Sequence, residues 1–314
     1  MNSNDRNLPL VEERDLSLDV IKAILIICVV LGHAMRIGTY SGGMNIIVDF
    51  IYHFHMPLFV LLTGYFFKFD MPSVLIKKIV MRYWLPYCSG GMLFVIGLRI
   101  FKGVSVVESL RNLVVGRGLG AMWFLYTIAA IETILYVSYV LFRRNREFGL
   151  LMAIALFVIT IEAPIRVESW SVFYFLCGML LKGNLIDCRW GIVFGFLAVI
   201  IYSIVDLPWY TDLSFVSMCF VISIGLLLHW SAKRLLKFHV GSFLAWLGKG
   251  TLVILIFHPL FNLVLSRTAQ FFSTIEKTGL SFWLIEAIVG IVGSLFLGRI
   301  LRFVKLNRLF GLKA

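Results

Sequence analysis

The chain has 314 residues, of which 60% are hydrophobic and 15% charged, and its mean hydropathy is +0.94. This composition leaves too little polar surface to cover a water-soluble globule, so it excludes an ordinary soluble enzyme. The formal net charge of +12 would suggest nucleic-acid binding in a soluble protein, but the basic residues stand between apolar segments. We therefore expect a lipid bilayer, and no nucleic acid, as the partner of this chain.

Apolar runs recur along the whole chain and predict an all-α, polytopic transmembrane helical bundle of about ten spans. No linker, low-complexity tract or fixed-period repeat divides the chain, so residues 1–314 are predicted to form a single membrane domain. No small-residue cleavage site follows the first run, which is therefore expected to be retained as a span. The predicted spans are 17–36, 44–67, 83–101, 120–142, 149–162, 167–182, 189–205, 212–230, 242–265 and 281–304.

The distribution of Lys and Arg among the connections predicts the orientation of these spans. Alternate connections, counted with both ends of the chain, hold nineteen basic residues, whereas the other connections hold six. Because cytoplasmic loops are enriched in Lys and Arg, both termini are predicted to be cytoplasmic. Two of the basic segments, 68–82 and 231–240, also contain large apolar residues, so each is either an interfacial helix or a solvated loop.

Ionisable side chains are rare in the predicted spans, and each is a functional candidate because burying a charge in lipid is costly. With the N-terminus inside, Lys22 lies near the cytoplasmic end of its span, and His33 lies roughly 16 Å further along the helix. The second and ninth spans bring further histidines to overlapping depths, and imidazole suits proton transfer near neutral pH. The set is Asp19, Lys22, His33, Asp49, His53, His55, Glu132, Lys249, His258 and Glu286.

Structural roles compete with functional ones for several of these residues. Asp19 and Lys22 are spaced i, i+3 and can form an ion pair on one helix face. A lone membrane histidine is often an interhelical hydrogen-bonding group, and Lys249 and Glu286 are expected to be structural. No metal site is predicted, because His53 and His55 point to different sides of a helix. No disulfide framework is predicted from the five cysteines, which are Cys28, Cys88, Cys177, Cys188 and Cys219.

Four segments resemble, in order, the acyltransferase family 3 membrane proteins. Residues 14–34, RDLSLDVIKAILIICVVLGHA, are similar to the first transmembrane helix of that family, whose Arg-x10-His pattern appears here as Lys22 and His33. The D-x-x-K opening resembles the branch of fucose 4-O-acetyltransferase-like and exopolysaccharide O-acetyltransferase members. At this position the ammonium of Lys22 is a point charge, whereas the guanidinium of the usual Arg is a planar group that can bind a phosphate through two hydrogen bonds. The other segments are FHMPLFVLLTGYFF (54–67), with Thr63 where Ser is usual, MWFLYTIAAIE (122–132) and FHPLF (257–261).

The resemblance implies transfer of an acyl group, commonly acetyl from cytoplasmic acetyl-CoA, to a sugar hydroxyl of a surface polysaccharide or its lipid-linked precursor. His33 is then either the general base or a covalent acyl carrier. Lys22, paired with Asp19, or the basic residues Lys77, Lys78 and Arg82 would attract the CoA phosphates. His55 would orient the acceptor or His33, while Trp123, His53 and His258 would contact the substrates.

Two other functions remain open at this level. A glycan or lipid transporter also uses intramembrane His, Asp and Glu residues, but it predicts inverted repeats that the sequence lacks. A non-catalytic assembly partner in polysaccharide synthesis would tolerate loss of His33. The resemblance implies a multi-pass protein of the bacterial inner membrane, while the sugar acceptor and the oligomeric state are not specified by the sequence.

Overall fold

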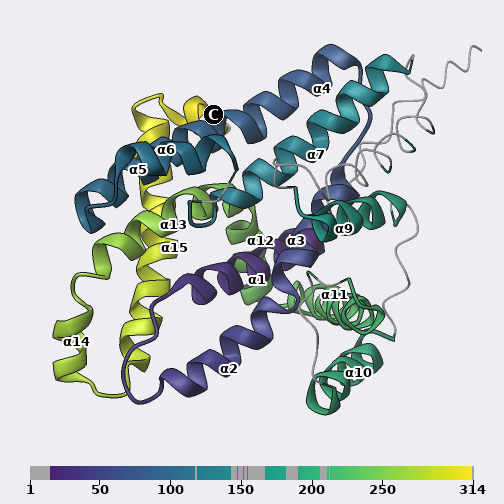
Figure 1. The fold of residues 1–314 in the computed structure, drawn as a ribbon. Coiled ribbons are helices and arrows are strands. Elements are labelled where there is room, and N and C mark those ends of the chain that lie inside the picture. The colour runs from purple at the N-terminus through teal and green to yellow at the C-terminus, as the bar shows by residue number, and fades with distance from the viewer. Residues whose placement is uncertain are drawn as a thin grey trace, which may run out of the picture.

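The structure is a computed structural model, and it describes residues 15–116, 119–142, 167–181, 190–205 and 213–312, together with residues 147, 151, 154 and 211. These parts of the chain contain helices and connections but no strand, which confirms the all-α prediction for them (Figure 1). The elements are α1 (Leu16–His33), α2 (Ser41–Tyr52), α3 (His55–Phe66), α4 (Pro72–Ile79), the π-turn η1 (Val80–Trp84), α5 (Leu85–Lys102), α6 (Val106–Val114), α7 (Met122–Leu141), α9 (Ser169–Leu180), α10 (Gly191–Ile204), α11 (Phe215–Leu235), α12 (His239–Lys249), α13 (Thr251–Leu265), α14 (Ala269–Ile275), α15 (Leu280–Phe303) and the 3₁₀ turn η4 (Asn307–Phe310).

Six helical segments in the described part of the chain are long and apolar enough to cross a membrane, and a bent pair would make seven. They correspond to the predicted first, second, third, fourth, eighth and tenth spans. The sixth and seventh appear as shorter apolar helices, α9 and α10. Nearly all of the expected fifth span, 149–162, lies outside the described residues, so the count of ten stays a prediction.

The ninth predicted span, 242–265, is not one straight helix. It is divided into α12 and α13, which meet at Gly250 with a bend of 76°. Gly250 ends the first helix and begins the second. Gly248, two residues before the bend, faces the backbone of Asp19 so closely that a Cβ there would overlap the Asp19 carbonyl. The close crossing of α12 over α1 thus accounts for the small residues around the bend.

The second predicted span, 44–67, is also interrupted, at His53 and Phe54 between α2 and α3. Pro57 has no amide hydrogen and cannot donate to the carbonyl of His53, four residues earlier, which weakens the helix at this point. In segment 68–82, helix α4 begins at Pro72 and continues through η1 into α5, so most of this segment is helical. In segment 231–240, α11 runs on to Leu235 and α12 begins at His239, so most of this segment is helical too.

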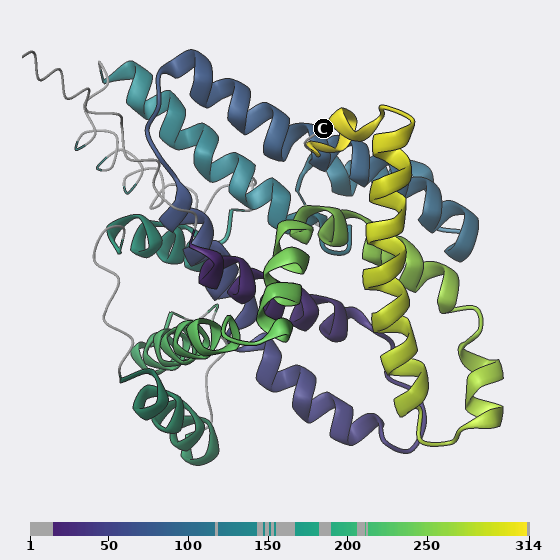
Figure 2. The same cartoon turned by 180° about the vertical axis from the view of Figure 1, so that it is seen from behind.

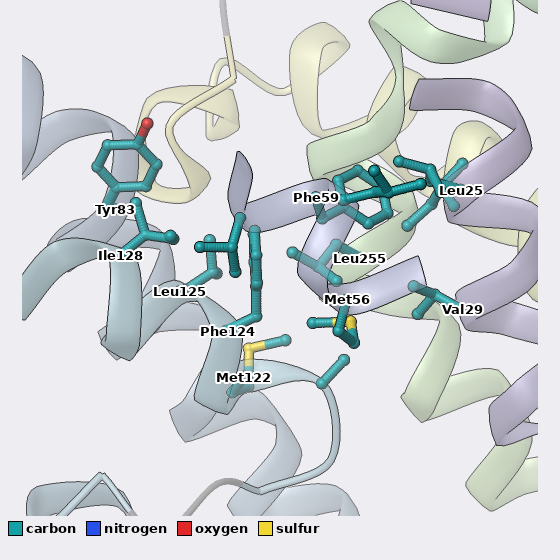
Figure 3. Packing of buried hydrophobic residues seen from close by; sticks show 14 of the residues in the cluster. Leu25, Val29, Met56, Phe59, Tyr83, Met122, Phe124, Leu125, Ile128 and Leu255 are labelled. Carbon is teal, nitrogen blue, oxygen red and sulfur yellow. The ribbon is translucent and has the colours of Figure 1, made fainter. Parts of the chain in front are cut away.

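Helix α1 lies in the middle of the molecule, as Figures 1 and 2 show, and packs against α2, α3, α11, α12, α13 and α15. Lipid tails are as apolar as leucine side chains, so helices in a membrane associate mainly through close packing. The core is accordingly built from apolar side chains of α1, α3, α7 and α13 that interlock between the helices. Figure 3 shows Leu25 and Val29 of α1, Met56 and Phe59 of α3, Phe124 of α7 and Leu255 of α13.

Candidate functional site

Lys22 and His33 lie on the same face of α1. Eleven residues make just over three full turns, so the two side chains project in similar directions roughly 16 Å apart along the axis. His33 is the last residue of α1 and is exposed, three residues before the expected end of the span. The helix therefore presents a basic group in its first half and an accessible imidazole at its C-terminal end.

Three of the predicted site histidines come together around that end. The rings of His33 and His258 lie 5.5 Å apart between centroids and are tilted by 42°. His55 and His258 are both close enough to His33 for their charges to interact. His258 is 0% exposed and His55 is 1% exposed. The exposed ring of His33 thus lies beside buried residues that include His55 and His258.

Hydrogen bonds to the backbone define which nitrogen carries hydrogen in the two buried rings. Nδ1 of His55 lies 2.7 Å from the carbonyl oxygen of Ile51, and Nδ1 of His258 lies 2.7 Å from that of Ile254. A carbonyl oxygen cannot donate, so each Nδ1 is the N–H donor and each Nε2 keeps a lone pair in the neutral ring. Both rings therefore present an acceptor nitrogen on the edge away from their own helix.

Pro259 explains why His258 bonds its own helix. A proline at this position cannot donate to the carbonyl of Leu255, which loses its helical partner. The ring of His258 hydrogen-bonds the neighbouring carbonyl of Ile254, and the Leu255 carbonyl lies close enough to affect the same ring. The His-Pro pair thereby fixes the orientation of the imidazole within α13.

Side chains from three other helices bind the last three carbonyls of α1, residues 31–33. Trp283 Nε1 of α15 donates to the Leu31 carbonyl at 3.0 Å. The Tyr52 hydroxyl of α2 donates to the next carbonyl at 3.4 Å, and Asn262 Nδ2 of α13 donates to that of His33 at 3.2 Å. The last carbonyls of an α-helix have no partner within the helix, so these donors hold the end of α1 in place.

Glu286 extends this set of contacts to the segment after α1. Its carboxylate is 1% exposed and accepts the backbone N–H of Met35 at 2.7 Å. Arg36 lies close enough to His33 and Tyr52 for its charge to act on both. The structural role expected for Glu286 is thus one of holding the backbone beside His33.

His53 lies apart from the other three histidines. Its Nδ1 bonds the backbone carbonyl of Asp49 at 2.8 Å. Its ring contacts Tyr202 of α10 and Phe220 of α11, with centroids 5.9 Å and 6.4 Å away. The structure therefore places His53 and His55 toward different neighbours, as their spacing of two residues predicts.

Asp19 and Lys22 form an ion pair with a distance of 3.0 Å between Lys22 Nζ and the buried Asp19 carboxylate. The same ammonium lies over the ring of Phe66 at 4.5 Å from its centroid. The ion-pair alternative is thus realised, and the ammonium is held beside the C-terminal end of α3. This contact also sets the N-terminal half of α1 against the end of the broken second span.

The other predicted site residues lie in different parts of the fold. Trp123 begins α7 and packs against Trp170 of α9, with ring centroids 5.9 Å apart. Lys77 is exposed on α4, while Lys78 and Arg82 lie within electrostatic range of the buried Glu132 carboxylate of α7. The structure shows no direct contact of these four residues with the histidine group. Within the described ranges, no group of three or more His, Cys, Asp or Glu side chains could hold a metal ion.

Several residues of the site were not predicted from the sequence. Tyr52 binds α1 from the next helix, whereas Trp283 and Asn262 bind it from helices far away in the chain. No periodic pattern in the sequence predicts these contacts. Asn262 could have been predicted from the sequence, because it is a polar amide within the apolar stretch 251–265. It follows His258 by four residues and therefore lies on the same helix face. Tyr52 is adjacent to the His-x-His sequence but resembles an ordinary aromatic residue of a span.

Comparison with known proteins identifies the family of the chain. The model of acyltransferase family 3, described as an acyltransferase domain, matches residues 15–299. One curated relative, the nodulation protein NolL of Sinorhizobium fredii strain NGR234, is 45% identical over 56 residues. That match covers 17% of this chain and only 15% of the length of NolL. No solved structure matches the chain. Because the family model covers most of the sequence, this multi-pass membrane protein belongs to acyltransferase family 3.

Proposed function

We propose that the protein is an O-acyltransferase of the bacterial inner membrane that moves acetyl from cytoplasmic acetyl-CoA to a sugar hydroxyl. The acceptor is a surface polysaccharide or its lipid-linked precursor. Membership of an acyltransferase family supports the reaction class. The observation that carries the proposal is the exposed imidazole of His33, held at the end of α1 beside the buried ring of His258.

The reaction needs a group that takes up a proton and later returns it. In the direct route, the sugar oxygen bonds to the thioester carbonyl carbon while His33 removes its proton. The carbon–sulfur bond then breaks, and the departing thiolate takes the proton from His33 to give free CoA. In the covalent route, a His33 nitrogen first bonds to the thioester carbonyl carbon and the CoA thiolate leaves. The sugar oxygen then bonds to the same carbon, the bond to the imidazole breaks, and the proton of the sugar hydroxyl ends on the CoA sulfur. Both routes yield the sugar ester and CoA, and both require His33.

The donor side of the site is proposed to lie along α1 toward Lys22. This ammonium shares a helix face with His33 and stands roughly three turns nearer the predicted cytoplasmic end. A flexible thioester arm could extend along this face while a cation attracts the phosphates at its other end. Lys77, exposed on α4, with Lys78 and Arg82 is the second candidate for this attraction.

Transport of a glycan or lipid is the alternative function. Its support in the structure is the pair of interrupted helices, α2–α3 and α12–α13, because transporters often bind substrates at broken helices. Membership of an acyltransferase family does not favour this alternative. Transport would require neither binding nor turnover of acetyl-CoA, which makes the two functions separable by experiment.

Label transfer from radiolabelled acetyl-CoA into membrane glycans tests the proposal. The purified protein should label the glycans, and His33→Ala should lower the rate by roughly 100-fold or more, because both routes lose their reactive nitrogen. The matched control is His239→Ala, which removes an exposed imidazole at the start of α12 and should label like the wild type. Equal labelling by His33→Ala would contradict the mechanism, and absence of acetyl-CoA binding would favour transport.

A further inference from the structure

The hydrogen-bond donors around the end of α1 are largely in use. Tyr52, Trp283 and Asn262 donate to the last three carbonyls of that helix. His55 and His258 donate from Nδ1 to carbonyls of their own helices. Nε2 of His258 and Oδ1 of Asn262, which have no hydrogen-bonding partner in the described part of the chain, are acceptors. Apart from the second hydrogen of the Asn262 amide, these side chains have no N–H or O–H left to donate to a substrate.

Both routes of the proposed reaction create a negative charge beside His33. When the sugar oxygen or the His33 nitrogen bonds to the carbonyl carbon, the electron pair of the carbonyl π-bond moves onto the carbonyl oxygen. This oxyanion persists until the carbonyl re-forms and the leaving group departs. Donors and cations fixed near such an oxygen usually give the largest single contribution to catalysis. The site therefore needs a donor that the side chains around the end of α1 do not supply.

Arg36 is a cation next to this position. It follows His33 by three residues, and its charge acts on both His33 and Tyr52. Its side chain is exposed, and it makes no hydrogen bond or ion pair with any residue that the structure describes. A guanidinium carries five N–H donors, so these remain available for a ligand.

The segment that carries Arg36 is tied down on both sides. The N–H of Met35 donates to the carboxylate of Glu286 at 2.7 Å, and the N–H of Thr39 donates to the carbonyl of Lys277 at 2.8 Å. These bonds fix the backbone before and after Arg36 and so limit the positions that its guanidinium can reach. A cation that is held near its place before the reaction stabilises a developing charge without further reorganisation.

The proposed direction of the acyl donor brings its carbonyl toward Arg36. The thioester arm extends along α1 from Lys22, so its acetyl end lies at His33, and Arg36 follows His33 on the side away from Lys22. From this arrangement we infer that Arg36 is a catalytic residue whose guanidinium stabilises the oxyanion. The inference rests on the proposed function. The remaining N–H of Asn262 is a weaker candidate, because hydrogen bonds from a charged donor are roughly twice as strong as those from a neutral one.

Substitution of Arg36 tests this role in the full-length protein, with radiolabelled acetyl-CoA and membrane glycans as substrates. Arg36→Ala should lower kcat on the order of 100-fold, the usual effect of losing one oxyanion donor. The KM values for acetyl-CoA and the glycan should change little, because the charge forms only after both have bound. Arg36→Lys keeps a cation and should recover part of the rate. Arg111→Ala is the matched control, since it removes an exposed guanidinium from α6 and should label like the wild type.

The rates are compared on the high-pH plateau, where His33 is neutral in every variant. If Arg36→Ala reaches the wild-type rate there, Arg36 acts only on the protonation of His33 and the assignment is overturned. A higher KM for the glycan at an unchanged kcat would also overturn it, because Arg36 would then bind the acceptor. Where Arg36→Ala does not fold, Arg36→Gln is the neutral variant, with an expected loss of about tenfold or more. Absence of labelling by the wild type would contradict the proposed function itself.

Discussion

The imidazole of His33, which we propose takes part in the reaction, depends on contacts made by the backbone beside it. His33 ends α1, and helix ends usually fray because their last carbonyls lack partners within the helix. Here the carbonyls of residues 31–33 are bound by side chains of α15, α2 and α13. A ring at a helix end thereby gains the fixed position that a catalytic group needs.

Glu286 offers a direct test of this positioning. Glu286→Leu removes the acceptor of the Met35 amide, and leaving a buried donor unpaired costs about 1–3 kcal/mol. We expect a lower unfolding temperature and a kcat about tenfold lower, with an unchanged KM for acetyl-CoA, because the contact lies beside His33 and far from Lys22. Steady-state kinetics and thermal unfolding in detergent measure these effects.

Glu286→Gln is the matched variant, because its amide oxygen can still accept the Met35 N–H. It should recover most of the lost activity and stability. A glutamine variant as impaired as the leucine variant would show that the charge of Glu286, and not this hydrogen bond, is what the site requires.

Only the site residues whose side chains are unusual in an apolar span can be predicted from the sequence. His33, His55 and His258 are detectable because an imidazole in an apolar span is unusual by itself. Tyr52 and Trp283 act through contacts between helices, and their side chains are common in membrane spans. Their contribution therefore becomes visible only when the packing of α1 against α2 and α15 is known.

At the level of helices, the structure depends on glycines where two backbones cross. Gly248 of α12 lies against the carbonyl of Asp19, and Gly64 and Gly178 place α3 and α9 in similar contact. The absence of a side chain lets the helices approach closely, which is the main source of attraction between helices in lipid. These positions cannot accept even a methyl group without a shift of one helix.

Gly248→Ala should therefore destabilise the protein, although alanine normally favours a helix over glycine. The added Cβ would overlap the Asp19 carbonyl, and such overpacking typically costs about 1–3 kcal/mol. Gly42→Ala in α2 is the control, because a Cβ there meets nothing within 4 Å. Thermal unfolding in detergent should show a lower midpoint for Gly248→Ala alone. Equal midpoints for both variants would contradict the close crossing.

Hydropathy predicts where the helices are but not where they break. A window of about 19 residues averages over a single glycine, so the apolar run 242–265 reads as one span. The bend at Gly250 lies two residues after the point where α12 crosses α1 at Gly248, and no local pattern contains that crossing. The interruption before Pro57 is easier to predict from the sequence, because a proline lacks the amide hydrogen that a helical hydrogen bond needs.

For the whole molecule, two connections expected outside the cell lie at the same end of the bundle. The backbone N–H groups of Thr39 and Tyr40 donate to the carbonyls of Lys277 and Thr278. Arg267, in the second of these connections, also donates to the carbonyls of residues 100–101 at the end of α5. The side of the membrane that this end faces stays a prediction from the basic residues.

Labelling of single cysteines in intact cells tests this orientation. In a variant without its native cysteines, Ser105→Cys and Ser273→Cys occupy exposed positions in connections predicted to lie outside. Both should react with a membrane-impermeant maleimide. Ser73→Cys, exposed at the start of α4, should react only after the cells are permeabilised. The opposite pattern would invert the topology and move Lys22 away from the cytoplasm.

The way in which the end of α1 is held also determines when the site can exist during synthesis. His33 leaves the ribosome well before its partners Asn262, Trp283 and Glu286, because all three lie more than 200 residues later in the chain. A nascent chain that has inserted only its early helices therefore carries His33 on an unsupported helix end. Under the proposed function, the site is completed only when α15 enters the membrane, so a chain without α15 should not consume the acyl donor.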